Sequence, residues 1–399
     1  MDHDVKTVAY VLNEFPVLSE TFVGNEIRAM TKRGHTIVPI ARHRPGATAQ
    51  VEDMALARSV AYLDETGGAA VASGLLGVHL LPRPRLAAAL AFLNGQTVLD
   101  RRRLFTDAMK IAALARAAGC THVHAHFADA ATAAAILAAR WMGVKVSFVC
   151  HGRELYAKPP AVSPDDLVRM LVAADFVISV GADLTNDLLA LTPLPLITTI
   201  PYATDPSFFT PRSEPQDNGR LLFVGGQLNV HKGLDDLIHA LELLLPRRIR
   251  LDVVGDGPHR PYLEQLANLR VPGLVTFLGR RPLEWIAAEG PAYLGLVGPF
   301  KVAADGSRDS GPVVVKEAMA MGLPVVASRF MGLKETVTSE TGFLYEPGNI
   351  PQLAAAIRRL ADLEPTARHE MGRAARKRVI ERFSLDSQAA SLSELIETM

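Results

Sequence analysis

Four segments of the sequence place glycine and polar or charged side chains directly after an apolar run. One of them, Phe223–Gly233 (FVGGQLNVHKG), joins an expected strand to an expected helix, with Lys232 just before the helix. Backbone N–H groups and an ammonium group at a helix N-terminus form an anion site best suited to phosphate. The P-loop pattern G-x-x-x-x-G-K-[ST] is absent, so on this segment alone a turn with a solvated lysine is the simpler interpretation.

Two further segments follow expected strands in the same half of the chain. Val254–Pro258 (VGDGP) is a glycine turn of a kind common in α/β proteins. Asp305–Glu317 (DGSRDSGPVVVKE) is a polar loop that leads into a helix, with Pro312 near the first helical position, where proline is tolerated. Glu317, about one turn inside, could accept hydrogen bonds from a diol such as a ribose, or could cap its own helix or pair with a basic neighbour. Three such loops at one sheet make a chance arrangement less plausible than any single loop does.

The fourth segment, Cys150–Glu154 (CHGRE), lies in the first half, directly after the expected strand Val144–Cys150. A histidine that ends a strand and precedes a glycine points into a cleft, so His151 is a candidate for ligand contact. The alternative is a structural histidine in a turn. A nucleophilic Cys–His pair is disfavoured because neighbouring residues of a strand point to opposite faces.

Three histidines, His122, His124 and His126, alternate at the expected strand Thr121–Ala125. Alternation places them on one face and could suggest a metal. However, no cysteine or carboxylate lies at ligand spacing except Asp129, and protein metal sites usually need three or four such ligands. We therefore expect no metal site.

The composition is that of an ordered globular protein. Among 399 residues, 42 Lys and Arg balance 42 Asp and Glu, which argues against a nucleic-acid-binding protein that relies on bulk positive charge. An apolar fraction of 49% with 6% aromatics suits helices packed on buried parallel strands. Two cysteines, Cys120 and Cys150, are too few for a disulfide scaffold and favour a reducing, cytoplasmic setting. The most apolar stretch, Gly67–Leu81, is too short and too interrupted to span a bilayer.

Apolar runs without polar alternation, typical of strands buried on both faces, alternate with amphipathic helices along both halves. This pattern predicts an α/β fold with two Rossmann-like, doubly wound domains that face each other across a cleft. Residues 41–118 are rich in Arg and Ala and are expected to be helical in pieces. The expected strands are Val5–Leu12, His35–Ile40, Thr121–Ala125, Val144–Cys150, Phe176–Val180, Ile197–Ile200, Arg220–Val224, Arg250–Val254, Val275–Leu278, Tyr293–Val297 and Val325–Ala327.

A segment with three prolines, Asp205–Gly219, interrupts the alternation and is expected to link the domains. The predicted N-terminal domain is therefore 1–205, and the predicted C-terminal domain is 206–380. Residues 381–399 are expected to form a helix that packs back toward the N-terminal domain.

Taken together, these motifs resemble those of the family 4 retaining glycosyltransferases, which have the GT-B architecture of two Rossmann-like domains. The resemblance covers nearly the whole chain, and its opening segment is similar to that of bacterial exopolysaccharide members of the colanic-acid or amylovoran type. The segments that carry it are Asn13–Val23 (NEFPVLSETFV), His124–Ala128 (HAHFA), His151–Gly152, Val254–Pro258, Phe277–Arg280 (FLGR), Gly311–Ala320 and Gly322–Ala327 (GLPVVA).

The resemblance implies a nucleoside-diphosphate-sugar donor with UDP or GDP, and no cofactor or metal, because cationic side chains and helix N-termini neutralise the leaving group. It assigns the donor sugar to His151, the diphosphate to Lys232 and the ribose to Glu317. The expected catalytic residues are His151, Asp309 and Glu317. The expected donor-binding residues are Gly226, Gln227, Lys232, Gly255, Gly257, Arg280, Ser310, Gly311, Pro312, Val313 and Glu317, and the expected acceptor-binding residues are Glu20, His126 and Glu154.

The sequence departs from the family pattern in two places. Gln227 stands where the family usually has an Arg beside the Lys of the diphosphate clamp, and a charge-assisted hydrogen bond is worth about 1.5–3 kcal/mol. The clamp is therefore expected to be weaker unless a neighbouring cation compensates, and the candidates are His231, Lys301 and Arg308. Asp309 replaces the first Glu of the family's Glu-x7-Glu motif and is followed by Ser310 instead of glycine, which affects the expected contact with sugar hydroxyls and the choice of donor.

With this resemblance, the sequence is interpreted as that of a metal-independent, retaining hexosyltransferase that acts on a saccharide, lipid-linked or small-molecule acceptor. The alternatives are a degenerate GT-B protein that serves as a nucleotide-sugar-binding or scaffold module, and another GT-B enzyme such as a nucleotide-sugar epimerase or a phosphorylase. The protein is expected in the cytoplasm, without a nucleic-acid partner. An apolar stretch, Leu86–Leu93, with basic neighbours would suit a peripheral contact with anionic lipid on the inner face of the membrane, although an ordinary surface helix is the favoured interpretation. The basic neighbours are Arg83, Arg85, Arg101, Arg102 and Arg103.

Overall fold

The structure, a computed structural model, describes residues 4–17, 20–46, 51–78, 81–157, 162–193, 196–212 and 217–398. The chain folds into two compact units. The first unit comprises Met1–Ile200 together with Gln388–Met399, and the second unit comprises Pro201–Ser387. The chain thus leaves the first unit once and returns to it with its last helix.

The first unit is built on a seven-stranded parallel sheet with the strand order β3-β2-β1-β4-β5-β6-β7. Its strands are β1 (Thr7–Glu14), β2 (Thr36–His43), β3 (Ala61–Tyr62), β4 (His122–His126), β5 (Lys145–Cys150), β6 (Phe176–Ser179) and β7 (Ile197–Thr199). The central strands are buried on both faces, as in the run 8–12 of β1, because helices cover both sides of the sheet.

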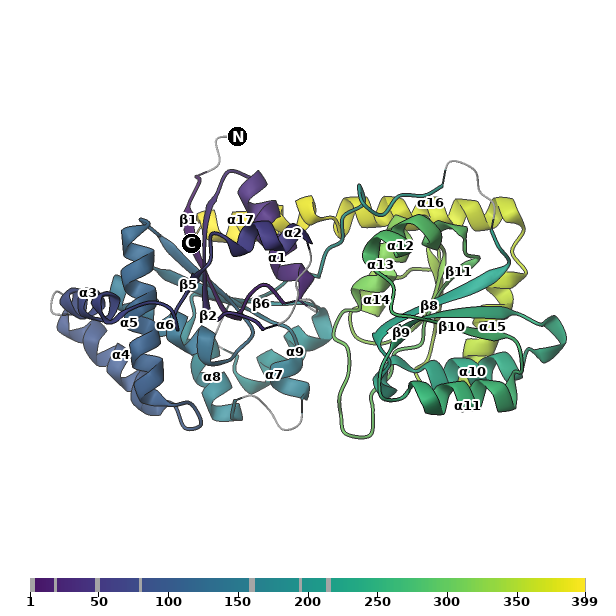
Figure 1. The fold of residues 1–399 in the computed structure, drawn as a ribbon, viewed down its shortest axis with the longest axis horizontal. Helices are drawn as coiled ribbons and strands as arrows, with labels where there is room; N and C mark the ends of the chain where they lie inside the picture. The colour runs from purple at the N-terminus through teal and green to yellow at the C-terminus, as the bar shows by residue number, and fades with distance from the viewer. Residues whose placement is uncertain are drawn as a thin grey trace. The chain divides into compact units, whose positions relative to one another are not determined.

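The helices of the first unit are α1 (Thr21–Lys32), α2 (Val51–Ala57), α3 (Gly68–Val78), α4 (Arg83–Gly95), α5 (Arg101–Ala117), α6 (Ala130–Met142), α7 (Arg153–Tyr156), α8 (Pro164–Ala173), α9 (Ala182–Leu191) and the last part of α17 (Leu385–Thr398). In Figure 1, α1, α2 and α17 lie together on one side of the sheet and α3, α4, α5 and α6 on the other. Two hydrogen bonds hold α17 there. Gln388 Nε2 donates to Glu26 Oε2 over 3.2 Å, and Ser393 Oγ lies 2.7 Å from Nε2 of His35.

The second unit is built on a six-stranded parallel sheet with the order β10-β9-β8-β11-β12-β13. Its strands are β8 (Arg220–Gln227), β9 (Arg250–Asp256), β10 (Val275–Gly279), β11 (Gly295–Gly298), β12 (Val325–Ser328) and β13 (Gly342–Tyr345). Its helices are α10 (Leu234–Glu242), α11 (Arg260–Arg270), α12 (Leu283–Glu289), α13 (Val313–Ala320), α14 (Leu333–Thr336), α15 (Ile350–Ala361) and α16 (Pro365–Arg382), with short 3-10 turns η1 (Val230–Lys232), η2 (Leu245–Arg247) and η3 (Gly290–Ala292).

Two apolar clusters fill the two sides of this second sheet. One joins it to α10, α11 and α15, through side chains such as Leu237, Leu263 and Ile357. The other joins it to α12, α13 and α16, through side chains such as Met319 and Val379. The two sets of helices lie on opposite sides of the sheet in Figure 1. The prediction of two doubly wound α/β domains is confirmed.

Both sheets reverse their strand order at one place, between β1 and β4 in the first unit and between β8 and β11 in the second. In open α/β sheets the loops at the carboxyl ends of the strands separate at such a switch point, and ligands bind there. Lys232 follows β8, and the polar loop with Asp309 follows β11. His151 follows β5, next to β4. Topology therefore brings Lys232 and the Asp309 loop to the switch point of the second unit, and places His151 one strand from the switch point of the first.

Candidate active site

The Lys232 loop is fixed against the segment that follows β11. Gly233, which ends η1, has φ 71°, and a Cβ atom there would lie 1.8 Å from the carbonyl oxygen of Pro299. Only glycine fits such a close approach in a left-handed conformation. The backbone N–H of Lys301 donates to the carbonyl of His231 over 3.0 Å. These contacts hold the loop across the switch point between β8 and β11.

An ion pair spans the switch point of the second unit. Lys232 Nζ lies 2.7 Å from Oδ2 of Asp309, and the two side chains are only 19% and 28% exposed. His231 Nε2 lies 3.9 Å from the other carboxylate oxygen of Asp309. The structure thus brings together the predicted diphosphate cation and the predicted catalytic carboxylate, which the sequence had suggested separately. Each neutralises the other in the unliganded protein.

The cations proposed to replace the family's arginine differ from one another in their surroundings. The side chain of Gln227 is exposed at the end of β8. Lys301 Nζ lies 2.8 Å from both Asp235 Oδ2 and Asp236 Oδ1. Burial alone would lower the pKa of Lys301, but these two carboxylates raise it above its ordinary value. Because its charge is already balanced twice, Lys301 is a poor substitute, whereas His231 stands at the ion pair itself.

The start of α13 presents the second part of the predicted donor site. Pro312 lies at the helix boundary, and the next two residues, Val313 and Val314, are partly exposed. Ser310 is buried, and its backbone carbonyl accepts a hydrogen bond from the N–H of Gly332. Glu317 is partly buried one turn further on, and burial raises its pKa to about 7. Its carboxyl group therefore exchanges its proton near neutral pH.

The backbone geometry also requires glycine at three of the positions predicted to bind the donor. Gly226 has φ 58° with open space beside it, at the point where β8 and β9 shift register. A Cβ at Gly255 would lie 3.0 Å from the carbonyl oxygen of Gly226, and one at Gly257 would lie 2.8 Å from the backbone nitrogen of Leu228. The two loops thus pack backbone against backbone, which explains these glycines without a ligand. Arg280 is exposed directly after β10.

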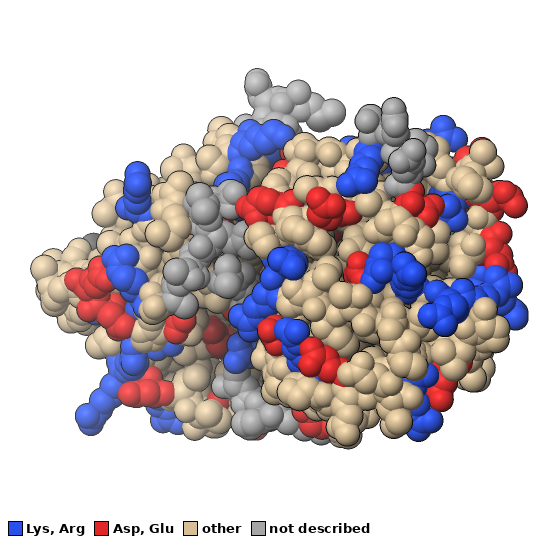
Figure 2. All heavy atoms as spheres, turned by 45° about the vertical axis from the view of Figure 1, so that its right-hand side comes forward, with Lys and Arg blue, Asp and Glu red and all other residues tan. Residues whose placement is uncertain are grey.

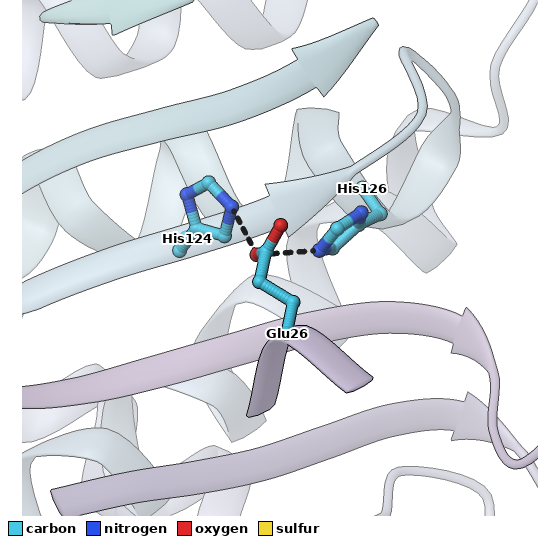
Figure 3. A group of neighbouring side chains, drawn as sticks. All are labelled: Glu26, His124 and His126. Carbon is cyan, nitrogen blue, oxygen red and sulfur yellow. Dashed lines mark hydrogen bonds and ion pairs between the residues drawn. The ribbon is translucent and has the colours of Figure 1, made fainter. Parts of the chain in front are cut away.

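In the first unit, Glu26 and the histidines of β4 form a buried cluster (Figure 3). His126 Nε2 lies 3.2 Å from Oε1 of Glu26, and His124 Nε2 lies 3.4 Å from the same oxygen. Glu26 comes from α1 and is 4% exposed. Glu26 was not among the predicted site residues; its sequence signal is a carboxylate within the apolar stripe of the helix, close to Val23, Ile27 and Met30.

His151 joins this cluster through His126. Nε2 of His151 lies 3.1 Å from Nδ1 of His126. The ring of His151 also contacts Phe127 and Phe22, with centroid separations of 4.3 and 4.7 Å. Burial and the nearby His126 hold the pKa of His151 well below its ordinary value, so this side chain is neutral. The structure therefore brings a predicted catalytic residue into direct contact with a predicted acceptor-binding residue.

The two predicted acceptor carboxylates have different environments. Glu154 is buried, and its carboxylate accepts the backbone N–H of Ala128 over 3.1 Å and that of His151 over 3.1 Å. It ties the turn after β5 to the turn after β4, which favours a role in positioning His151 over direct contact with an acceptor. Glu20 is partly buried at the start of α1. Burial raises the pKa of Glu20, and the charges of His126 and Arg153, which lower it, offset this only in part.

Glu26, His124 and His126 have one ligand atom each within 4.8 Å of one another, an arrangement that could hold a metal ion. The expectation of no metal rested on the absence of a nearby carboxylate in sequence, and Glu26 supplies one from a distant helix. The carboxylate is, however, already surrounded by hydrogen-bond donors. Tyr10 Oη donates to Oε1 over 3.1 Å and Gln388 Nε2 to Oε2.

The basic stretch considered for membrane contact lies on α4 and at the start of α5. Phe92 and Leu93 of α4 turn into the core, whereas Leu90 is exposed. Arg103 pairs with Asp64. Figure 2, which brings the other end of the molecule forward, shows Lys and Arg interspersed with Asp and Glu there. Among the described helices, none is long and apolar enough to cross a bilayer.

Comparison with known proteins agrees with this architecture. Residues 19–208 match the family described as Glycosyltransferase Family 4, and residues 218–362 match Glycosyl transferases group 1. The putative colanic acid biosynthesis glycosyltransferase WcaL of Salmonella typhimurium is 24% identical over 406 residues, which cover 98% of this chain and 100% of the relative. The amylovoran biosynthesis glycosyltransferase AmsK of Erwinia amylovora is 31% identical over 191 residues, or 45% of each chain.

Solved GT-B structures share the fold over the whole chain. Sucrose-phosphate synthase from Thermosynechococcus elongatus superposes with a TM-score of 0.71 at 20% identity and covers 98% of both chains. HepE of Anabaena in complex with UDP-glucose superposes with a TM-score of 0.69 at 16% identity, over 99% of this chain and 100% of the other. The two matched domains and the two parallel-sheet units together show that the chain belongs to the GT-B glycosyltransferases, with a Family 4 domain followed by a group 1 domain.

Proposed function

We propose that the protein is a metal-independent, retaining hexosyltransferase that uses a nucleoside-diphosphate sugar and transfers the hexose to a hydroxyl acceptor in polysaccharide or glycoconjugate synthesis. The observation that carries the proposal is the Lys232–Asp309 ion pair at the switch point of the second unit. Such a cation beside the partly exposed start of α13 suits a diphosphate. The UDP-glucose complex of HepE and the polysaccharide functions named for WcaL and AmsK support the same substrate classes.

In this proposal the second unit binds the nucleotide. Lys232 and the N–H groups at Val313 and Val314 face the diphosphate, and the ionised carboxylate of Glu317 accepts the ribose hydroxyls. Arg280 and the loops at Gly255 and Gly257 border the base. Fixed charges and dipoles aimed at the leaving diphosphate stabilise the negative charge that develops as the glycosidic bond breaks.

The sugar and the acceptor complete the proposed reaction. Asp309 contacts hydroxyls of the donor sugar, so it must give up part of its pairing with Lys232 when the donor binds. His151 contacts the sugar from the first unit, which also supplies the acceptor site near Glu20 and His126. The acceptor hydroxyl attacks from the face that the diphosphate leaves, and the diphosphate takes the acceptor's proton. Retention then needs no covalent nucleophile from the protein, whose work is positioning and electrostatic stabilisation.

The proposal is tested by incubating the protein with a panel of UDP- and GDP-sugars and measuring free nucleoside diphosphate and labelled product with saccharide and lipid-linked acceptors. Thermal shift against the same panel first identifies the donor. The expected result is stabilisation by one donor and its turnover. Stabilisation without hydrolysis or transfer would favour the binding-module alternative, and conversion of the donor into an epimeric nucleotide sugar would favour an epimerase.

A further inference from the structure

The helices α3 and α4 form a layer outside the helices that cover one side of the first sheet. Both contact α5 and α6, and in Figure 1 they lie together at one end of the first unit. A Cβ atom at Gly74 of α3 would lie 2.5 Å from the carbonyl oxygen of Met109 in α5, so the two helices pack closely. Arg140 of α6 donates to the carbonyl of Ala88 in α4 over 2.9 Å. The inner faces of α3 and α4 are therefore held in place.

The outer faces of these two helices are apolar. Leu75 and Leu76 of α3 are 39% and 71% exposed, and Leu90 of α4 is 41% exposed. The other exposed residues described in α3, at positions 68, 69, 72 and 73, are glycine, alanine and serine. Single exposed leucines are common on soluble proteins, but a helix without any charged residue is normally buried on all sides. The outer face of α3 and α4 thus has the composition of a surface that is covered by a partner.

The charged residues that border this face are almost all basic. Residues 67–103 contain five arginines and one aspartate, a net charge of +4 in a chain whose formal net charge is zero. The aspartate, Asp100, is the N-cap of α5 and accepts hydrogen bonds from the backbone of Arg102 and Arg103. Among the residues that the structure describes, neither Arg83 nor the side chain of Arg102 forms an ion pair. Their charges are therefore available to an anionic partner.

We propose that the outer face of α3 and α4 docks on an anionic lipid surface. Leu75, Leu76 and Leu90 would enter the headgroup region, and the neighbouring arginines would meet the lipid phosphates. Apolar area and basic side chains both strengthen such binding. A second copy of this chain suits the face less well, because a symmetric contact would bring the same arginines against each other.

The structure changes which residues make this contact. The sequence directed attention to Leu86–Leu93, but Phe92 and Leu93 face the core, and α3 supplies the most exposed leucine instead. The lipid surface does not depend on the proposed function. Under that function, docking would bring the first unit, which is proposed to bind the acceptor, to acceptors that are linked to lipid.

Flotation of the full-length protein with vesicles tests the proposal directly. One set of vesicles is phosphatidylcholine alone, and the other has equal parts of phosphatidylcholine and phosphatidylglycerol. We expect recovery with the anionic vesicles only, and less of it at high salt, because salt screens the attraction of the arginines. Equal recovery with both vesicles, or no recovery with either, would overturn the proposal.

Two leucine variants locate the apolar contact. Leu76→Glu removes an apolar side chain and adds a charge that anionic lipid repels, so affinity for the anionic vesicles should fall at least about ten-fold. Leu269→Glu is the matched control, since Leu269 lies on α11 of the second unit and is 73% exposed. It should leave vesicle binding unchanged. Because both leucines are exposed, both variants are expected to fold.

A double variant of the arginines tests the charge. Arg83→Ala with Arg102→Ala should weaken binding to the anionic vesicles by about five-fold for each arginine. The control is Arg373→Ala with Lys377→Ala on α16, where these cations lie beside Glu370 and Glu381. It removes the same charge and should have little effect. An equal loss in both pairs would show that only the net charge of the protein matters and would refute the assigned surface.

A fluorescent probe reports the contact itself. Cys120 and Cys150 are free and buried, so Leu76→Cys adds an accessible thiol that can carry a polarity-sensitive dye. Anionic vesicles should shift its emission to shorter wavelength, and the same dye at Leu269→Cys should not respond. A shift at both positions, or at neither, would contradict the proposal.

The outcomes separate this inference from its rivals and from the proposed function. Self-association of the wild type in light scattering, abolished by Leu76→Glu, would assign the face to a second copy of the chain. Vesicle binding that Leu76→Glu does not change would place the lipid contact elsewhere. If the wild type turns over no donor, the proposed function fails, whereas flotation needs no donor and still decides the lipid surface.

Discussion

Removal of the Lys232 ammonium is the most direct test of the proposed nucleotide site. In the unliganded protein Lys232 Nζ is 2.7 Å from Asp309 Oδ2. Lys232→Ala removes the side-chain cation expected to face the diphosphate and leaves Asp309 without it. The variant should bind UDP or GDP more weakly, and the loss should be much smaller for the bare nucleoside, which carries no phosphate.

The expected magnitude has two contributions. Loss of a charge-assisted hydrogen bond costs about 1.5–3 kcal/mol, or roughly ten- to hundred-fold in affinity. The unpaired carboxylate of Asp309 then repels the diphosphate, by about 3 kcal/mol for unit charges roughly 5 Å apart at an effective dielectric constant of about 20. Partial exposure of the pair reduces that second contribution, since its side chains are 19% and 28% exposed. We therefore expect a loss near the upper end, about hundred-fold.

Asp309→Asn separates these contributions. It releases Lys232 from a partly exposed ion pair worth about 1 kcal/mol or less, so diphosphate binding should tighten by up to about five-fold. The double variant Lys232→Ala with Asp309→Asn should lose about ten-fold only, because no carboxylate is left to repel the ligand. The cycle thus measures the coupling between the two side chains.

Calorimetry of the wild type and these variants with UDP, GDP and the matching nucleosides measures all of these differences. Lys301→Ala is the matched control, since this lysine lies at the same switch point but is held by Asp235 and Asp236. It should change diphosphate affinity little. Wild-type affinity in Lys232→Ala, or a greater loss in Lys301→Ala, would show that the diphosphate binds elsewhere.

Five further results are expected. Because burial raises the pKa of Glu317 to about 7, UDP affinity should rise between about pH 6 and 8 as the carboxylate ionises, and Glu317→Gln should flatten that calorimetric profile. The same shift should lower the free energy of unfolding in denaturant as the pH rises from about 4.5 to about 7, a dependence that Glu317→Gln should also remove. His151→Ala should lower kcat for transfer at least about ten-fold with nearly unchanged UDP affinity; equal losses in both would contradict its assignment to the sugar. Transfer should survive exhaustive chelation, and activity restored only by Mg²⁺ would refute metal independence. Gln227→Arg should tighten diphosphate binding, because the added cation lies at an exposed site at the end of β8; weaker binding would argue that this position does not face the ligand.

The strand pattern predicted most of the two sheets because parallel strands buried on both faces leave continuous apolar runs. Val5–Leu12 anticipates β1, and Phe176–Val180 anticipates β6. β3 and β13 were missed. β3 has two residues, Ala61–Tyr62, and β13 has four, Gly342–Tyr345. The two residues of β3 carry little signal of their own and form a strand by pairing with β2. β13 pairs with β12 and is as long as the predicted β6, so its length does not explain why it was missed.

Contacts between residues far apart in the chain could not be predicted from the sequence, for a different reason. Lys232 and Asp309 were identified in separate motifs, but their contact depends on β8 and β11 being neighbours in the sheet. Glu26 lies 100 positions from His126 and was not considered as its partner. Glu26 lies among the buried positions of α1, with Ile27 and Met30. Burial of an unpaired carboxylate costs too much free energy, so this position indicates that Glu26 has partners but does not identify them.

The two departures from the family pattern are linked through Lys232. Gln227 carries no charge, so the ammonium of Lys232 must balance both Asp309 in the empty protein and the diphosphate in the proposed complex. In that complex, hydroxyl groups of the sugar donate hydrogen bonds to Asp309 in place of Lys232, so that Lys232 can pair with the diphosphate. After transfer the sugar has left, and Asp309 competes again for the ammonium. Donor binding and product release would then depend on the same ion pair.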